Sequence, residues 1–434
     1  MPLPRALLAT LCLVVLTLVG CSKGGGNNSG NGNIRLFNAF LEASALNVVV
    51  GSTTVAPAAP FERLTPYVSV NNGVQTFLVT VVGAQSPLVN SSLSIGGDAH
   101  YTYIVFGPTT AVGAVFATDS FNDPGTGFYA VRVINTAAGV GPVDVYLTPP
   151  GADLTVAAPA VSNVAYGAVS SYLSVAIGAN FEIRMTPTGT KNVIFDSTPR
   201  LFAEHSGSTI VIYSKGSGTL VNAALLNDDG SGGGVIVDNL VAQYKVINAS
   251  LVASPLNVFV DGSLQLSNIP FAGVSNYQQT ATGAHSITVQ AQATPGATLL
   301  TLNPTLSAAS DTSIALVGPA GALGGVVLAD DNLPPAVGSA GVRFVNASAS
   351  TPSVDVFVNF SKQVSALTQN TASSYLNLTA TAVTGTVYEF DFNVTGTTTA
   401  LLKLTGVTIA APHKYTVYLA GPPGSLTGIV TQDN

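Results

Sequence analysis

Short runs of alternating apolar and polar residues fill most of the chain, and glycine, proline, asparagine or serine separates one run from the next. In residues 46–50, 256–260 and 354–358, an apolar residue stands at every second position. This alternation predicts β-strands with one buried face. Helical spacing of apolar residues never extends far enough to form a helix, so we expect an all-β protein.

Four asparagines mark equivalent points of an internal repeat, because each ends a strand-like run and an Asn or Asp follows nine residues later. The pairs are Asn38 with Asn47, Asn135 with Asp144, Asn248 with Asn257, and Asn346 with Asp355. A tyrosine follows each mark at an interval of 29 residues in three units and 37 in the second, at Tyr67, Tyr277, Tyr375 and Tyr172. The second unit therefore carries eight extra residues. We place them at the turn 148–151, where Pro and Gly interrupt a strand.

The units also end alike, because an apolar run stops at a glycine and an aspartate stands twelve residues later. These pairs are Gly107 with Asp119, Gly216 with Asp228, Gly318 with Asp330, and Gly421 with Asp433. Such spacings, kept in one order, predict four tandem repeats of about 100 residues. We place the repeats at residues 34–127, 128–240, 241–339 and 340–434.

Each repeat is rich in Val, Ile, Thr, Tyr and Phe, with turn residues every 8 to 12 positions or so. This pattern predicts an immunoglobulin-like antiparallel β-sandwich, and a small barrel is the alternative. A unit of this length can bury its own core, so we expect four independent domains arranged as beads on a string.

The N-terminus has the pattern of an export signal. Arg5 precedes an apolar run from Ala6 to Val19, which is too short to span a membrane but typical of a signal peptide. The run ends in Leu18-Val19-Gly20-Cys21, which resembles the lipobox of bacterial lipoproteins. The resemblance implies that residues 1–20 are removed, that Cys21 is lipidated, and that residues 21–33, rich in Gly, Asn and Ser, form a tether. Ser22 implies, by the same resemblance, an outer-membrane lipoprotein, periplasmic or surface-exposed.

Composition narrows the choice of partners. Charged residues make up 8% of the chain and the formal net charge is −7, so we expect no basic surface for nucleic acid. Cys12 lies in the signal and Cys21 carries the lipid, which leaves no cysteine for a disulfide. The membrane, reached through Cys21, is the one partner that the sequence indicates directly.

The fourth repeat resembles a known family. Its residues 342–348 (Val-Arg-Phe-Val-Asn-Ala-Ser) and 352–358 (Pro-Ser-Val-Asp-Val-Phe-Val) are similar to the opening of the bacterial domain-of-unknown-function family 4397 (DUF4397). Repeats 2 and 3 match more loosely, and repeat 1, with Asn47 and Gly51, is the weakest. The resemblance implies an exported or surface-attached sandwich, often in tandem, and supplies no catalytic residues.

The search for catalytic chemistry finds little. The single Gly-x-Ser-x-Gly-like match, residues 20–24, straddles the signal cleavage site, and no zinc, phosphate-loop or dinucleotide motif occurs. His100, His205 and His413 precede the last apolar run of separate repeats, so we expect them to form hydrogen bonds at strand entries, and His285 lies elsewhere. We predict no catalytic residue, no cofactor site and no metal site.

The repeated polar residues have two interpretations each. The Asn or Asp at positions 47, 144, 257 and 355 points away from the apolar side chains of its strand, so we expect solvent-side or turn-bonding groups, with ligand contact as the alternative. We expect the four tyrosines to be core rings with the hydroxyl at a sheet edge, and a row that stacks on carbohydrate is the alternative.

Carboxylates gather where one repeat passes to the next, at Asp119 with Asp123, at 228–229 and at 330–331. Such junctions suit calcium in principle, because calcium needs six to eight oxygens. Turn capping is the other interpretation, and Asp433, which has no repeat after it in this sequence, favours it. We therefore expect turn capping and no strong calcium site.

These observations favour a non-enzymatic, membrane-anchored lipoprotein whose tandem sandwiches act as a spacer, adhesion or assembly module. The alternative is a carbohydrate- or peptide-binding lipoprotein of a cell-envelope uptake or degradation system. In either case the ligand or partner, a protein or a glycan, stays unknown.

Overall fold

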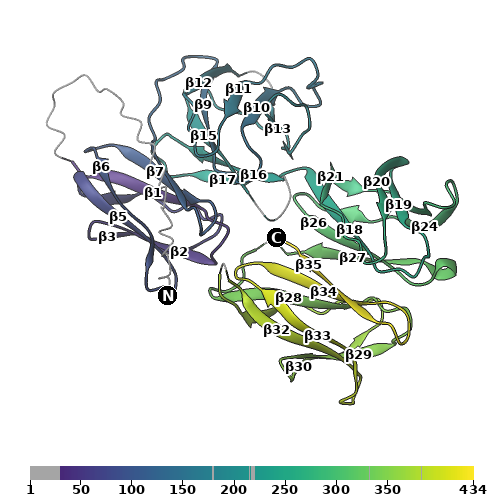
Figure 1. Ribbon diagram of the computed structural model, residues 1–434. Helices are drawn as coiled ribbons and strands as arrows, with labels where there is room; N and C mark the ends of the chain where they lie inside the picture. The colour runs from purple at the N-terminus through teal and green to yellow at the C-terminus, as the bar shows by residue number, and fades with distance from the viewer. Residues whose placement is uncertain (1–29, 178–179, 215, 217–219, 332, 383) are drawn as a thin grey trace, which may run out of the picture.

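The computed structural model describes residues 30–434 apart from 178–179, 215, 217–219, 332 and 383. They fold into four β-sandwiches, one for each expected repeat (Figure 1). The predicted signal segment, the predicted lipidation residue Cys21 and most of the predicted tether lie outside the described residues. Among those described, no helix has the length and apolar character needed to cross a bilayer. The expected all-β sandwich fold is confirmed.

Repeat 1 consists of two four-stranded sheets with the orders β4-β1-β7-β8 and β3-β2-β5-β6. The strands are β1 (Gly32–Ala39), β2 (Ala45–Val50), β3 (Thr53–Pro60), β4 (Val68–Val70), β5 (Gly73–Val81), β6 (Pro87–Ile95), β7 (His100–Phe106) and β8 (Gly113–Thr118). Strand β1 begins two residues before the expected start of the repeat, because Gly32 pairs with Val70 and Asn33 with Ser69. Gly32 and Asn33, which were expected in the tether, therefore belong to the first sheet.

Repeat 2 contains nine strands. They are β9 (Phe128–Asn135), β10 (Val143–Thr148), β11 (Val161–Val164), β12 (Leu173–Ala176), β13 (Glu182–Pro187), β14 (Phe195–Asp196), β15 (Gly207–Ser214), β16 (Val221–Asn227) and β17 (Gly234–Val237). The sheets have the orders β12-β9-β15-β16-β17 and β11-β10-β13-β14. Only Gly51 and Ser52 separate β2 from β3 in repeat 1, whereas residues 149–160 separate β10 from β11. The predicted site of the insertion is confirmed.

Repeats 3 and 4 follow the same plan, with sheets β21-β18-β26-β27, β20-β19-β23-β24, β31-β28-β34-β35 and β30-β29-β32-β33. Repeat 3 contains β18 (Val241–Asn248), β19 (Leu256–Val260), β20 (Ser263–Ile269), β21 (Gln278–Ala281), β22 (Gly283–Ala284), β23 (Ile287–Ala291), β24 (Thr298–Leu302), β25 (Thr305–Leu306), β26 (Asp311–Val317), the 3-10 helix η1 (Ala320–Ala322) and β27 (Gly324–Asp330). Repeat 4 contains β28 (Ser339–Asn346), β29 (Ser353–Val358), β30 (Ser361–Thr368), β31 (Leu376–Thr379), β32 (Thr386–Val394), β33 (Ala400–Ile409), β34 (Lys414–Ala420) and β35 (Thr427–Gln432).

One strand pair in every repeat is parallel, which the expected antiparallel sandwich does not include. The pairs are β1 with β7, β9 with β15, β18 with β26, and β28 with β34. The chain crosses to the opposite sheet and back between the two strands of each pair, and such a crossover allows a parallel pairing. The first strand of each repeat thus lies beside the strand that ends at the repeat's glycine.

The four sandwiches associate in two pairs, so the expectation of independent beads on a string is wrong. Each repeat does have a core of its own between its sheets. Two further apolar clusters lie outside these cores, one shared by repeats 1 and 2 and the other by repeats 3 and 4. They form because the strands of the parallel pair carry apolar residues on both faces, as Phe37 and Ile104 do on the outer face in repeat 1. The second face needs a partner sheet.

Candidate functional site

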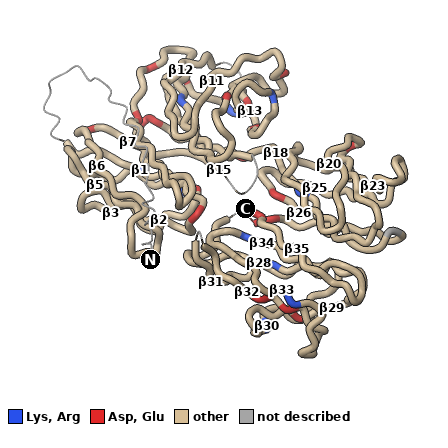
Figure 2. The backbone as a smooth tube through the Cα atoms, viewed as in Figure 1, with Lys and Arg blue, Asp and Glu red and all other residues tan. Residues whose placement is uncertain are grey.

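A basic residue stands three positions before each asparagine mark, on the outer face of the first strand of its repeat. These residues are Arg35, Arg132, Lys245 and Arg343, all almost fully buried. Charged residues are sparse along the described part of the chain (Figure 2). A buried cation repeated four times in such a chain needs a buried anion, and the aspartate that ends each repeat supplies it.

Arg35 joins repeat 1 to repeat 2. Its Nη2 atom lies 3.3 Å from Asp228 Oδ1 and 3.4 Å from Asp119 Oδ2, and all three side chains are fully buried. Its Nε donates to Thr102 Oγ1 (2.8 Å), and its Nη1 donates to the carbonyl of Gly233 (3.1 Å). The guanidinium of repeat 1 therefore bonds a carboxylate and a carbonyl of repeat 2.

Arg132 makes the reciprocal connection from repeat 2. Its Nη2 donates to Asp119 Oδ1 (2.9 Å), its Nη1 to the carbonyl of Thr118 (2.8 Å), and its Nε to Thr209 Oγ1 (2.7 Å). We call the set Arg35, Asp119, Arg132 and Asp228 the 1–2 cluster. Two cations and two anions balance its charge across the interface.

Two of the repeat tyrosines complete the 1–2 cluster. Tyr67 donates its hydroxyl to Asp119 Oδ2 (2.6 Å), and Tyr172 donates to Asp228 Oδ2 (2.8 Å). The guanidinium carbon of Arg35 lies 4.8 Å from the centre of the Tyr67 ring, and that of Arg132 lies 4.8 Å from the Tyr172 ring. One face of each ring is thus occupied by a cation.

The same arrangement joins repeats 3 and 4, and we call it the 3–4 cluster. Lys245 Nζ donates to Asp433 Oδ1 (2.7 Å) and to the Gln432 carbonyl (2.9 Å). Arg343 forms an ion pair with Asp330 and donates to the Ala329 carbonyl (2.8 Å). The remaining two tyrosines donate their hydroxyls to the same two aspartates. Tyr277 donates to Asp330 (2.6 Å) and Tyr375 donates to Asp433 (2.8 Å).

Burial sets the protonation of these groups. Desolvation, reinforced by the neighbouring aspartates, raises the pKa of the Tyr67 and Tyr277 hydroxyls well above the usual range, so they stay protonated and donate. Desolvation also raises the pKa of Asp228 to about 6, although Arg132 opposes the shift. The pKa of Asp330 is raised, first by burial and then by the charge of Asp433.

The expectation that the terminal aspartates cap turns is wrong for the first residue of each group and confirmed for the second. The first residue, such as Asp119 or Asp228, accepts hydrogen bonds within the buried clusters. Asp123, Asp229 and Asp331 do cap turns, because each accepts from the backbone N–H two residues later. Asp433, at the same spacing, bonds Lys245 of repeat 3.

The repeated Asn and Asp residues of the second strand are bonded to the backbone, as expected. Asn47, Asp144, Asn257 and Asp355 accept from the N–H of Ala58, Asn163, Asn268 and Ala366 respectively. Each donor residue has a positive φ, between 43° and 59°, in the neighbouring edge strand. Asp144 and Asp355 are buried, not solvent-side. The side chain thus stabilises a left-handed residue that bends the edge strand.

The histidines occupy separate places. His100 packs edge-on against the Tyr67 ring, with ring centres 4.8 Å apart, and His205 Nδ1 lies 2.8 Å from Asp123 Oδ1. His285 Nδ1 lies 2.7 Å from Asp261 Oδ2. Across the described part of the chain, no three His, Cys, Asp or Glu side chains gather closely enough to hold a metal ion.

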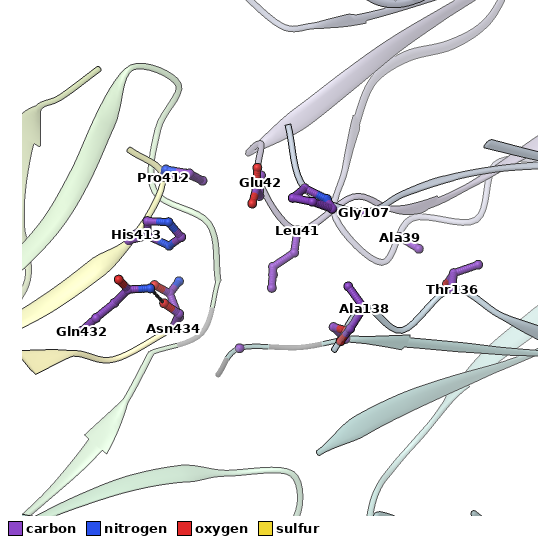
Figure 3. Close-up of a pocket in the computed structure, with 13 residues that line it drawn as sticks. Ala39, Leu41, Glu42, Gly107, Thr136, Ala138, Pro412, His413, Gln432 and Asn434 are labelled. Carbon is purple, nitrogen blue, oxygen red and sulfur yellow. Dashed lines mark hydrogen bonds between the residues drawn. The ribbon is translucent and has the colours of Figure 1, made fainter. Parts of the chain in front are cut away.

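A cavity of about 240 Å³ lies where repeats 1, 2 and 4 meet (Figure 3). Leu41 and Glu42 of repeat 1 face His413 and Asn434 of repeat 4 across it, and Ala138 of repeat 2 closes one side. The Glu42 carboxylate already accepts from the backbone N–H of Thr109. Thr136 and Ser214 also line the cavity, and the Ser214 hydroxyl donates to the carbonyl of Ala138 (3.1 Å).

Comparison with protein families decides what the repeats are. Residues 32–146, 242–356 and 340–434 match the family described as Domain of unknown function (DUF4397). The chain belongs to this family. The resemblance seen in the fourth repeat is therefore confirmed. Repeat 1 lies wholly within the matched residues, whereas residues 147–241 of repeat 2 lie outside them. The insertion between β10 and β11 begins in that unmatched stretch.

Other comparisons add little to the DUF4397 assignment. No curated protein matches the chain. A solved family CBM26 module from Eubacterium rectale Amy13K, in complex with maltoheptaose, is 14% identical over 42% of this chain and 92% of its own, with a TM-score of 0.15. Family 41 carbohydrate-binding modules from streptococcal virulence factors, described for alpha-glucan recognition, are 10% identical over 44% and 95%, with a TM-score of 0.18. Likeness at this level supports no shared ligand.

Proposed function

We propose that this DUF4397 protein is a non-enzymatic lipoprotein of the bacterial cell envelope, anchored in the outer membrane through Cys21. Its four sandwiches form two rigid blocks that act as a spacer and assembly module. The observation that carries the proposal is the reciprocal cluster at each pair interface. Two cross-repeat cation–carboxylate contacts and a shared apolar surface fix the angle between the paired repeats. Rigid blocks suit a scaffold that holds something at a set distance from a membrane.

The repeated tyrosines do not favour the alternative of glycan binding. A platform that stacks on sugar needs an open ring face. The rings of Tyr67, Tyr172, Tyr277 and Tyr375 each have Arg or Lys over one face and bond a buried aspartate through the hydroxyl. Their recurrence along the chain is explained by the pairing of the repeats.

Cell fractionation combined with protease shaving tests the proposal. We expect the wild-type chain in the outer-membrane fraction and the Cys21→Ala variant in the soluble or precursor pool, because two acyl chains anchor the mature protein. Protease added to intact cells, or to cells with a permeabilised outer membrane, then shows on which side of that membrane the repeats lie. An anchored Cys21→Ala variant after detergent-free washing would contradict the proposal.

A further inference from the structure

We propose that His285 is a pH-sensitive latch at the junction between the two blocks. When the imidazole is protonated, it holds β21 of repeat 3 against the junction, residues 238–240. When the ring loses its proton, one of its two bonds is lost and the junction loosens, so the angle between the blocks depends on pH. The inference concerns this junction alone, so its failure would leave the membrane-anchored scaffold intact.

The surroundings of His285 require a proton on both ring nitrogens. The ring is almost fully buried. Its Nδ1 lies 2.7 Å from Asp261 Oδ2, and its Nε2 lies 2.8 Å from the carbonyl oxygen of Ala281. A carboxylate and a carbonyl only accept hydrogen bonds, whereas a neutral imidazole carries a single N–H. The neutral ring can therefore bond one of these two oxygens, and the imidazolium ion bonds both.

The electrostatics around the ring agree with this geometry. Burial disfavours the charged ring, but the bonds to Asp261 and to the Ala281 carbonyl outweigh it and raise the pKa of His285 above its usual 6.5. The pKa of Asp261 is lowered by His285 and by the Ser286 N–H, so this carboxylate stays ionised. Burial and then Asp261 raise the pKa of Tyr244, on β18, to about 12, so its hydroxyl stays neutral. The histidine is thus the group that changes charge near neutral pH.

The Ala281 carbonyl connects the latch to the junction. Ala281 ends β21 and pairs with Val241, the first residue of β18. The next residue, Thr282, donates its N–H to the carbonyl of Leu240 (2.9 Å), and Leu240 donates its own N–H to the carbonyl of Asp196 in repeat 2 (2.7 Å). A bond that fixes Ala281 therefore fixes the strand on which the junction rests.

Repeats 1 and 4 use neutral donors at the position of the latch. The same turn bond aligns the repeats, since backbone N–H groups donate to carbonyls in the pairs Gly51 with Thr76, Asp261 with Ser286, and Asn359 with Glu389. Tyr388 of repeat 4 therefore corresponds to His285. Its hydroxyl donates to the carbonyl of Thr379, the last residue of β31, just as His285 donates to the last residue of β21. Gln75 corresponds in repeat 1 and donates to the Asn72 carbonyl (3.1 Å). The titratable ring thus stands in the repeat that begins at the junction between the blocks.

Hydrogen exchange of the full chain between about pH 5.5 and 8.5 tests the latch. Peptides that cover the junction and β21 are followed by mass spectrometry, and rates are corrected for the intrinsic effect of pH on exchange. An NMR titration gives the pKa of His285, whose imidazole signal is the one missing from His285→Gln. This variant keeps a neutral donor, as Gln75 does in repeat 1. His205→Gln, at the exposed pair with Asp123, is the matched control.

We expect exchange at the junction and in β21 to rise as the pH passes the His285 pKa. The rise should be about tenfold for each pH unit by which the measured pKa exceeds 6.5, because protonation stabilises the closed junction and this stabilisation is lost at high pH. His285→Gln should abolish the step, Asp261→Asn should move it to lower pH, and His205→Gln should leave it unchanged. Small-angle X-ray scattering should show a wider range of angles between the blocks at high pH in the unmodified chain and not in His285→Gln.

Three results would overturn the proposal. The first is exchange at the junction that does not depend on pH in the unmodified chain, and the second is a step that persists in His285→Gln. The third is a His285 pKa at or below 6.5. Scattering that is equally independent of pH in the unmodified chain and in His285→Gln would show that the junction does not control the angle between the blocks.

Discussion

The two pairs of repeats bury similar clusters of charged residues, but different apolar residues surround these clusters. Both bury a reciprocal cluster of two cations and two aspartates, yet the 1–2 pair surrounds it with aromatic rings and the 3–4 pair with alanines and one Tyr418 ring. The same hydrogen bonds and ion pairs therefore occur at both interfaces, whereas the apolar packing around them differs. The difference teaches that the buried charges specify how two repeats dock, while the apolar residues around them set how tightly.

Removing a cation should give the largest effect and should separate the two pairs. Arg35→Ala leaves Asp119 and Asp228 short of a partner, and breaking a buried pair costs about 3–5 kcal/mol. Lys245→Ala should cost less, about 2 kcal/mol, because Lys245 bonds one carboxylate and one carbonyl, whereas Arg35 reaches two carboxylates, a hydroxyl and a carbonyl. Urea titration followed by tyrosine fluorescence measures both. Arg63→Ala, at an exposed side chain, is the control and should change little.

Truncation of equivalent apolar residues should sharpen the contrast. Phe106 ends β7 and Val317 ends β26, and both are buried against the paired repeat. Phe106→Ala should cost about 3–5 kcal/mol and Val317→Ala roughly half of that, since the valine side chain buries fewer carbons. Thermal unfolding of the two variants makes the comparison. An equal loss of stability would mean that the aromatic packing does not distinguish the pairs.

Loss of the hydroxyl should matter at one buried tyrosine of the interfaces and hardly at another. Tyr213 donates to Glu62 across the 1–2 interface (2.8 Å), so Tyr213→Phe should destabilise the protein by about 1 kcal/mol. Tyr418→Phe removes a buried hydroxyl that neighbours Ser313 but forms no hydrogen bond of ordinary length among the described residues, so it should change stability little. Denaturant midpoints of the two variants measure the difference. Destabilisation by Tyr418→Phe would show that this hydroxyl is hydrogen-bonded in solution.

A further effect concerns pH. The pKa of Asp228 is raised from 3.8 to about 6 in the folded state, so folding takes up a proton there. This contribution, about 3 kcal/mol, is fully present below pH 3.8 and is lost as the pH rises through about 6. Asp355, whose pKa is lowered by the N–H groups of Ala366 and Gly396, acts in the opposite sense, and its contribution is lost as the pH falls. Unfolding of Asp228→Asn between about pH 4 and 7 should lack the component that falls with rising pH.

Spacing along the chain was enough to predict the repeats, the sandwich and the insertion in repeat 2. Spacing did not predict that the repeats associate in pairs. A residue that recurs in every repeat has the same spacing whether it contacts its own repeat or the neighbouring one. Asp433 shows the difficulty, since its spacing suggested a turn while its carboxylate bonds Lys245 of repeat 3. The missed signal was the cation three residues before each asparagine, in a chain where only 8% of residues are charged.

Hydrogen exchange in an Arg132→Ala variant tests most directly whether the pair, and not the single repeat, is the cooperative unit. Arg132 belongs to repeat 2 but bonds Asp119 and the Thr118 carbonyl at the end of repeat 1. Exchange of each repeat is followed by mass spectrometry of its peptides. The account predicts faster exchange in repeats 1 and 2 together, with repeats 3 and 4 unchanged. Faster exchange confined to repeat 2 would contradict it.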